Sequence, residues 1–227
     1  FQFLRHSERR IAKIPRNGVR NLYEKYQGND LRIAFKTFRH DESIPVLPLL
    51  SNKKMSKYYN RETSAGIVCF SEMASGLEIP ENTPFYYATC VTEFEDYGLD
   101  KIVEASKSDD GRFSQERFVE RGMSSISPLT QFKILYNMPL SFISIDKHLT
   151  GDNAVIYDSA RGLIDCAKYA PVEDLVIIGA GRVRRDGRVE SGFAALSKLE
   201  IDALPEYEDE IQAVEIFRNL YAERSRH

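Results

Sequence analysis

Ser159 is the residue of this sequence whose position is best suited to chemistry. It stands between an apolar stretch typical of a strand, Ala154 to Tyr157, and a segment with the apolar spacing of a helix, Ala160 to Tyr169. A hydroxyl at the start of a helix lies beside free backbone N–H groups, where the helix dipole stabilises negative charge. Ser159 could therefore act as a nucleophile or help to hold an anion. An ordinary helix cap is the more common role of a serine at this position, because serine is among the residues preferred there.

A serine nucleophile needs a general base, for which histidine is the usual choice. The sequence contains His6, His40, His148 and His227, and His148 belongs to the same region as Ser159. Closeness in sequence does not imply hydrogen-bond distance, and we expect His148 on a polar loop before the strand. A Ser–His pair remains an open alternative at this point.

A glycine-rich stretch, GAGRVRRDG, follows a predicted strand over Leu175 to Gly179 and invites comparison with phosphate-binding loops. Gly179 and Gly181 fit such a loop, but the third glycine is missing and charged residues stand where a helix should begin. We therefore expect a turn that leads into another extended segment. Four arginines here could bind a phosphate, such as that of a phosphopantetheine arm, or the acidic face of a carrier protein, although a solvated hairpin explains them as well: Arg182, Arg184, Arg185 and Arg188.

The composition narrows the class of protein. A chain of 227 residues with 42% hydrophobic residues can bury a substantial core. The formal net charge of −3 provides no basic field for nucleic acid, and the longest apolar runs are too short to span a membrane. Cys69, Cys90 and Cys166 are odd in number and far apart, which predicts buried thiols in a reducing, cytoplasmic compartment. No residue spacing indicates a metal site, and no cofactor is expected.

The apolar pattern also predicts the elements around this region. In chain order these are a strand over residues 31–38, an extended linker over 44–51, a helix over 56–74 that stops at Gly76, a strand over 84–92 buried on both faces, a helix over 97–108, a polar surface excursion over 109–127 with a short helix, and one buried helix over 127–145 despite Pro139. The strand–helix–strand succession from Ala154 to Gly179 is typical of a crossover between parallel strands.

These elements predict an α/β fold with a mixed, mostly parallel sheet flanked by helices. We divide the chain into an N-terminal segment over 1–50, a central region over 51–195 and an acidic helical tail over 196–227. The tail is expected to form an amphipathic helix that docks on this domain or on a partner, because one apolar stripe runs along it: Ile211, Val214, Phe217, Leu220 and Tyr221.

Three segments between Met55 and Phe193 together resemble the N-terminal half of the thiolase-like β-ketoacyl synthases, and in particular the chain-length-factor subunits of polyene and aromatic polyketide pathways. MSKYYNRETSAGI is similar to that family's first helix. SPLTQFKILYNMPLSFISI is similar to its segment around an Asn and a Ser-Ile pair, here Asn137 and Ser144-Ile145. TGDNAVIYDSARGL and DLVIIGAG are similar to its nucleophile turn and the strand that follows.

The resemblance implies a thiolase-like half-fold with an altered site. Ser159 takes the position of the family's nucleophilic cysteine when Gly162-Leu163 is aligned with the residues that follow it, and Tyr136 replaces a histidine that is not catalytic. The family's two catalytic histidines belong to a C-terminal half that has no counterpart after Phe193. Claisen condensation needs a thiolate, and a serine without a base is no substitute. The resemblance therefore implies that this chain is not a ketosynthase by itself.

By resemblance, we expect a non-catalytic subunit that supports a complete ketosynthase in fatty-acid or polyketide-type biosynthesis, as a heterodimer or as a homodimer. Pairing is expected through the strand of Ala154, Val155, Ile156 and Tyr157, because half a subunit leaves that strand and the next helix in need of cover, either from a partner or from the terminal helix of this chain. Two alternatives stay open. One is an acyltransferase or hydrolase that uses Ser159 as acyl acceptor, and the other is a module that binds acyl carrier protein through the arginines.

Overall fold

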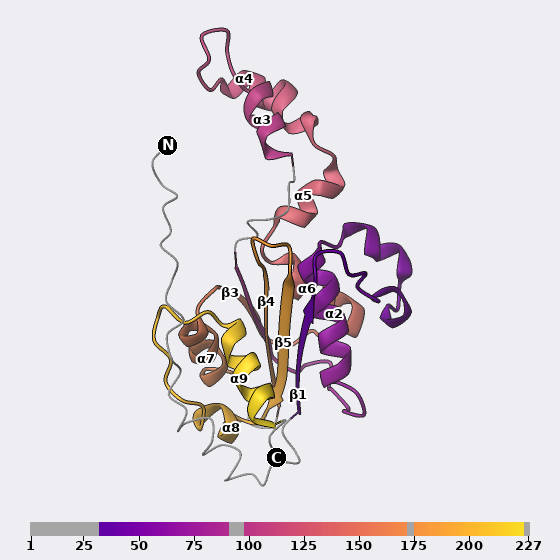
Figure 1. The fold of residues 1–227 in the computed structure, drawn as a ribbon, viewed down its shortest axis with the longest axis vertical. Helices are drawn as coiled ribbons and strands as arrows, with labels where there is room; N and C mark the ends of the chain where they lie inside the picture. Colours follow the sequence, from indigo (N-terminus) through magenta and orange to yellow (C-terminus); the bar gives the residue numbers. More distant parts are fainter. Residues whose placement is uncertain (1–31, 91–97, 172–174, 225–227) are drawn as a thin grey trace.

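The computed structural model describes residues 32–90, 98–171 and 175–224, which are built around a five-stranded sheet (Figure 1). The strands lie in the order β1-β5-β4-β2-β3, and their bounds are β1 (Arg32–Phe38), β2 (Phe85–Thr89), β3 (Asn153–Tyr157), β4 (Val176–Val183) and β5 (Val189–Leu196). β2 runs parallel to β3 and β4, whereas β5 runs antiparallel to β4 and β1. The predicted α/β class with a mixed sheet is confirmed. Parallel pairing is confined to the three strands at one side, so it does not dominate the sheet.

Helices cover both faces of the sheet (Figure 1). α2 (Arg61–Met73) and α6 (Met138–Lys147) pack on one face, where the core is rich in aromatic rings. α7 (Ala160–Lys168), α8 (Lys198–Asp202) and α9 (Val214–Arg224) pack on the other, more aliphatic side. The predicted strand-to-strand crossover is present as β3, α7 and β4, and it passes over β2, which lies between the two strands.

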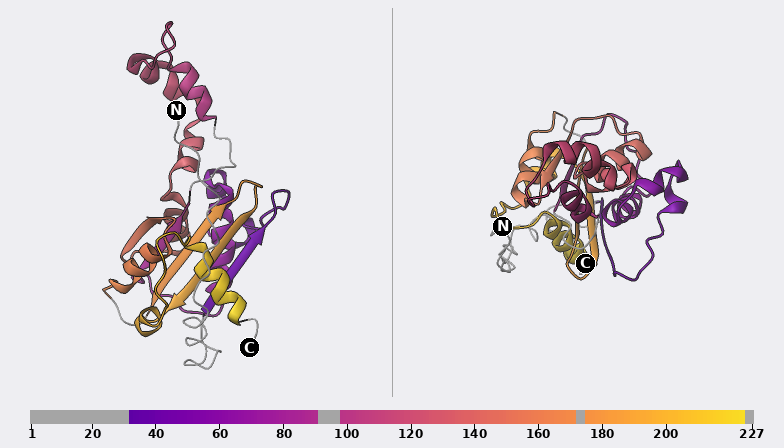
Figure 2. Two further views of the ribbon diagram at one scale, coloured as in Figure 1. Left: turned by 60° about the vertical axis from the view of Figure 1, so that its left-hand side comes forward. Right: turned by 90° about the horizontal axis from the view of Figure 1, so that it is seen from above.

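A long excursion separates β2 from β3 and extends beyond the end of the sheet (Figure 2). We call residues 99–134 the arm. It contains α3 (Leu99–Ala105), α4 (Gln115–Arg117), a π-helical turn (Phe118–Gly122), a 3-10 turn (Met123–Ser125) and α5 (Pro128–Ile134). The predicted surface excursion is thus observed, with more helical turns than expected.

Local signals account for most element boundaries. The Asn60 side chain accepts a hydrogen bond from the Thr63 N–H at 2.8 Å, so α2 begins after Asn60 and a separate 3-10 turn (Lys53–Tyr58) precedes it. Gly76 adopts φ +71° just beyond the helix, as the predicted stop requires. All five residues of β2 are buried, which confirms that strand as buried on both faces. The predicted linker holds a single 3-10 turn (Leu47–Leu49).

Two predicted elements are wrong in extent. The single helix expected over 127–145 is divided into α5 and α6, because Pro139 lacks an N–H and is accommodated only in the first turn of a new helix. β4 does not end at Gly179 but continues to Val183, through both glycines. A Cβ on Gly179 would lie 2.4 Å from the Phe193 ring, and one on Gly181 would lie 2.2 Å from the Tyr87 hydroxyl oxygen. These glycines therefore allow close packing across the sheet, and the expected turn follows at Arg184.

The C-terminal segment completes the core of this domain. Ile211, Val214, Phe217 and Leu220 of the predicted stripe are buried, and α9 contacts β1, β5 and β4. The acidic cluster over 206–210 precedes the helix and is not part of it. β1 from the N-terminal segment and α9 from the tail thus pack on the same sheet as the central region.

Candidate functional site

Ser159 lies where the sequence placed it, between the end of β3 and the start of α7. Asp158 makes the turn with a left-handed backbone, φ +50°, and its N–H donates to the Thr89 carbonyl at 2.9 Å. The turn therefore stands at the carboxyl ends of the parallel strands β2 and β3, the edge at which ligands of α/β sheets usually bind.

The hydrogen bonds of this turn make Ser159 a helix cap. Its Oγ accepts a hydrogen bond from the Gly162 N–H at 3.0 Å. The Ala160 N–H donates to the Ile211 carbonyl at 2.9 Å, so a second amide of the first helical turn is also occupied. A site that stabilises an oxyanion needs free N–H groups directed at the reacting atom. Here the chain itself takes up two of them.

The segment before α9 also holds the turn through side chains. The Gln212 amide nitrogen donates to the Asp158 carboxylate at 2.9 Å. The Gln212 side-chain oxygen in turn accepts a hydrogen bond from the Arg182 guanidinium. Ile211 and Gln212 therefore lie over the turn that carries Ser159 and fix its conformation. This arrangement positions a backbone, and it includes no proton acceptor bonded to the Ser159 hydroxyl among the described residues.

The two histidines in the described part of the chain lie far from Ser159. His148 ends α6 and precedes β3, whereas Ser159 follows β3. A strand of five residues at about 3.3 Å per residue separates them by roughly 16 Å. His40 follows β1, at the other side of the sheet, four strand spacings or roughly 19 Å away. His148 is therefore not a base for Ser159, and His6 and His227 lie outside the described residues.

Arg182, one of the four arginines considered as phosphate ligands, is the centre of a buried ionic network. Its side chain is 8% exposed and lies 2.6 Å from Glu190 and 2.7 Å from Glu215. Arg218 joins the same two carboxylates, each at 2.6 Å. Burial alone would lower the pKa of Arg182, but the two carboxylates outweigh it and raise that pKa. Arg182 is thus not available to a phosphate at the surface.

The other three predicted phosphate ligands lie at the hairpin between β4 and β5. Arg184 is 3.7 Å from Glu190, and Arg188 forms an ion pair with Asp186 at 2.7 Å. Arg185 is exposed. Gly187 takes φ +75° in the tight turn, and β5 follows β4 where a phosphate-binding loop would lead into a helix, so the stretch is the hairpin turn that the sequence predicted.

The strand predicted as an interface forms one edge of the sheet. In the part of the chain that the structure describes, β3 pairs with β2 alone, so its outer backbone groups have no neighbouring strand. Ala154 and Ile156 pack into one core and Val155 into the other. Tyr157 is 57% exposed, and its ring meets Tyr136 edge-on with centroids 5.9 Å apart.

Exposed apolar side chains continue from this edge along the arm. Leu135 and Tyr136, which follow the arm, are each 50% exposed, and the large exposed apolar residues of the arm itself are Leu99, Val103, Phe113, Val119, Met123, Leu129 and Phe132. We call Tyr157, Tyr136 and Leu135 the edge patch. A row of apolar side chains beside an open strand is typical of a surface that a partner covers.

Glu62 is a buried carboxylate that sequence reasoning missed. It is 2% exposed and accepts hydrogen bonds from the Tyr87 hydroxyl at 3.1 Å and the Thr89 hydroxyl at 2.7 Å. Burial, followed by the charge of Glu62, raises the pKa of Tyr87 well above its ordinary value. An acidic residue in the first turn of a helix is ordinarily exposed and interacts with the helix dipole, so the sequence did not indicate that Glu62 contacts Tyr87 and Thr89.

Nothing in the remaining described residues adds reactive chemistry. Cys69 and Cys90 are buried, and burial raises the pKa of both thiols far above their ordinary value, so they stay protonated. Residues 32–90, 98–171 and 175–224 contain no group of three or more potential metal ligands. Within the same ranges no helix has both the length and the apolar character that crossing a bilayer requires.

Comparison with known proteins leaves the family open. No model of a known protein family matches the sequence, and no curated protein matches it. Any statement about function is therefore a proposal.

Proposed function

We propose that this chain is a non-catalytic, ketosynthase-like subunit that associates with a complete β-ketoacyl synthase in fatty-acid or polyketide-type biosynthesis. The observation that carries the proposal is the exposed edge patch beside β3, the strand that ends the sheet formed by the described residues. The sequence resemblance to the N-terminal half of thiolase-like synthases supplies the identity of the partner and the thiolase-like interpretation of the sheet.

The geometry at Ser159 supports the non-catalytic part of this proposal. Its hydroxyl accepts from the backbone of α7, the nearby Ala160 amide is taken by Ile211, and His148 is about a strand length away. An acyltransferase or hydrolase would need a base and free oxyanion donors at this position. No observation favours that alternative.

The partner surface is smaller than the sequence suggested. Leu163, Ile164 and Ala167 of α7 are at most 3% exposed, because the C-terminal segment of the same chain covers them. They need no cover from a partner, which leaves the β3 edge and the arm for that role. A partner that packs at the β3 edge would remove the edge patch from water.

The surroundings of the four arginines disfavour the alternative that this chain is a module that binds acyl carrier protein. Arg182 is buried, and Arg184 and Arg188 have carboxylate partners, so the predicted patch offers little free positive charge. An acidic carrier protein would have to compete with these partners.

Co-purification with a complete β-ketoacyl synthase encoded beside this chain tests the proposal. We expect a stable complex that Tyr157→Glu or Tyr136→Glu weakens at least tenfold, since a charge buried in an apolar contact is costly. Tyr169→Glu is the matched control, because Tyr169 is 88% exposed and lies at the far end of α7. Failure of the wild-type chain to bind the synthase would refute the association.

A second experiment tests the non-catalytic role. Ser159→Ala removes one cap hydrogen bond, and we expect it to leave product formation by the complex unchanged. Intact mass measurement after incubation with acyl thioesters should show no adduct on the wild-type chain. An acyl adduct that Ser159→Ala abolishes would establish Ser159 as an acyl acceptor and overturn this part of the proposal.

A further inference from the structure

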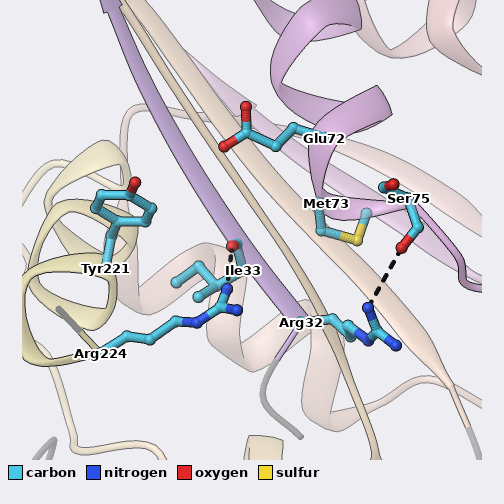
Figure 3. Close-up of a pocket in the computed structure, with 7 residues that line it drawn as sticks. All are labelled: Arg32, Ile33, Glu72, Met73, Ser75, Tyr221 and Arg224. Atoms are coloured by element: carbon cyan, nitrogen blue, oxygen red, sulfur yellow. Dashed lines mark hydrogen bonds between the residues drawn. The ribbon is translucent and has the colours of Figure 1, made fainter. Parts of the chain in front are cut away.

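A cavity of about 500 Å³ lies at the other edge of the sheet, away from Ser159 (Figure 3). Its walls come from the start of β1, the end of α2 and the end of α9, and its lining residues are Arg32, Ile33, Glu72, Met73, Ser75, Tyr221 and Arg224. Ile33 and Met73 line it from opposite sides of β1 and are each only 3% exposed, and the guanidinium groups of Arg32 and Arg224 lie on these two sides (Figure 3). The cavity thus combines positive charge with a small apolar surface.

Both guanidinium groups are anchored by backbone carbonyls. Arg32 donates from Nη1 to the Ser75 carbonyl at 3.3 Å, and Arg224 donates from Nη1 to the Ile33 carbonyl at 3.0 Å. An arginine carries five N–H donors, so each retains donors for a ligand. Anchoring of this kind reduces the rotamer entropy that an arginine loses on binding.

Neither guanidinium has a counter-charge within the described residues. No carboxylate there lies within ion-pair distance of Arg32 or Arg224, whereas Arg161, Arg182 and Arg218 all have carboxylate partners. The remaining acid of the cavity, Glu72, is neutralised by Lys36 at 2.5 Å. Within the part of the chain that the structure describes, the two guanidinium groups of this cavity therefore have no carboxylate partner.

The C-termini of α2 and α9 offset the positive charge of the two guanidinium groups only in part. Each helix C-terminus contributes roughly −0.5 elementary charge, so the two together offset about one of the two guanidinium charges. The cavity retains a net positive charge of about one, and the ligand that best fits it is an anion.

We propose that this cavity binds a small organic phosphate ester. A guanidinium engages two oxygens at once, and a phosphate has enough oxygens for two guanidiniums from different elements. A carboxylate has two oxygens and fully serves one guanidinium only. The organic part would lie against the wall that the Tyr221 ring lines. This site is independent of the subunit role proposed above, because it lies at β1 and not at β3.

Titration calorimetry on the full chain tests the proposal with phenyl phosphate, inorganic phosphate and benzoate as probes. We expect phenyl phosphate to bind more tightly than either of the others, with affinity that falls as salt rises. Arg32→Gln and Arg224→Gln should each weaken it about tenfold or more, since each removes charge-assisted hydrogen bonds. Arg121→Gln is the control, because this exposed residue lies on the arm and should leave affinity unchanged.

The outcomes separate the proposal from its rivals. Absence of phenyl phosphate binding to the wild-type chain overturns it, as does benzoate binding of equal strength. Equal affinity for inorganic phosphate overturns the organic part, since it means that the organic group gains nothing from the cavity wall. Circular dichroism establishes that both variants are folded, which is expected because Arg32 and Arg224 are exposed. Equal loss in Arg121→Gln would mean that binding is nonspecific.

Discussion

Replacing Arg182 by methionine should destabilise this protein more than any other single arginine substitution in the hairpin. The methionine fills much of the same space but removes the charge that faces Glu190 and Glu215. Both carboxylates would keep Arg218 at 2.6 Å, so they are not left entirely unpaired. Gln212 would also lose its contact with Arg182, and with it part of the support for the Asp158 turn.

The expected magnitude follows from burial and the remaining partners. Breaking a buried ion pair by removing one member costs about 3–5 kcal/mol. Because Arg218 compensates both acids, we expect the lower end, about 3 kcal/mol. At about 2–4 °C per kcal/mol for a chain of this size, the melting temperature should fall by roughly 6–12 °C.

Urea and thermal unfolding, followed by circular dichroism, measure both quantities. Arg188→Met is the matched control, because its side chain is 43% exposed, and exposed ion pairs contribute about 0.5 kcal/mol or less. A double-mutant cycle with Glu190→Gln should show coupling between positions 182 and 190. If Arg182→Met and Arg188→Met lose the same small stability, the network is not buried as described and the reasoning fails.

Two further perturbations test the packing and the pH dependence. Gly192→Ala would place a Cβ 2.1 Å from the Phe217 Cβ on α9, so we expect a loss of about 1–3 kcal/mol in urea unfolding, whereas Gly66→Ala, with its nearest contact at 3.2 Å, should be tolerated; equal effects would contradict the docking of α9. Burial acts to raise the pKa of Asp146, but hydrogen bonds from Lys147 and Ser51 outweigh it and lower that pKa below 3.8. The stability that the Asp146 carboxylate contributes is therefore fully present above pH 3.8 and is lost as pH falls through the lowered pKa. In Asp146→Asn the free energy of unfolding should depend less steeply on pH in this acid range, whereas the exposed control Asp41→Asn should keep the wild-type dependence. An Asp146→Asn protein with the wild-type pH dependence would contradict this reasoning.

Elements with local signals could be predicted from the sequence. Alternation in 31–38 and the apolar run in 84–92 correspond to β1 and β2, and Ser159 marks the start of α7. In each case the determining interactions lie within a few residues: a capping hydroxyl, a left-handed glycine or a periodic apolar face. The position of Ser159 as a cap was therefore accessible without tertiary structure.

The sequence-based predictions were wrong where the conformation of a residue depends on a neighbour that is distant in the sequence. Gly179 and Gly181 look like turn residues, yet they lie within β4 because Phe193 and Tyr87 approach them from other strands. Pro139 divides a helix whose apolar content alone predicted continuity. The amide of Ala160 is closed off by Ile211, a residue whose contact with α7 no local pattern indicates.

The sequence by itself determined the α/β class, the core strands and the capped helix after β3, because these depend on periodicity and backbone chemistry along the chain. Only the tertiary structure decided which charges are satisfied. Arg182, predicted as a surface ligand, is enclosed by Glu190 and Glu215, while Arg32 and Arg224, far apart in sequence, line one cavity and have no carboxylate partner among the described residues. The physical reason is that electrostatic interaction depends on distance in space and on burial, and neither is encoded in the separation of residues along the sequence.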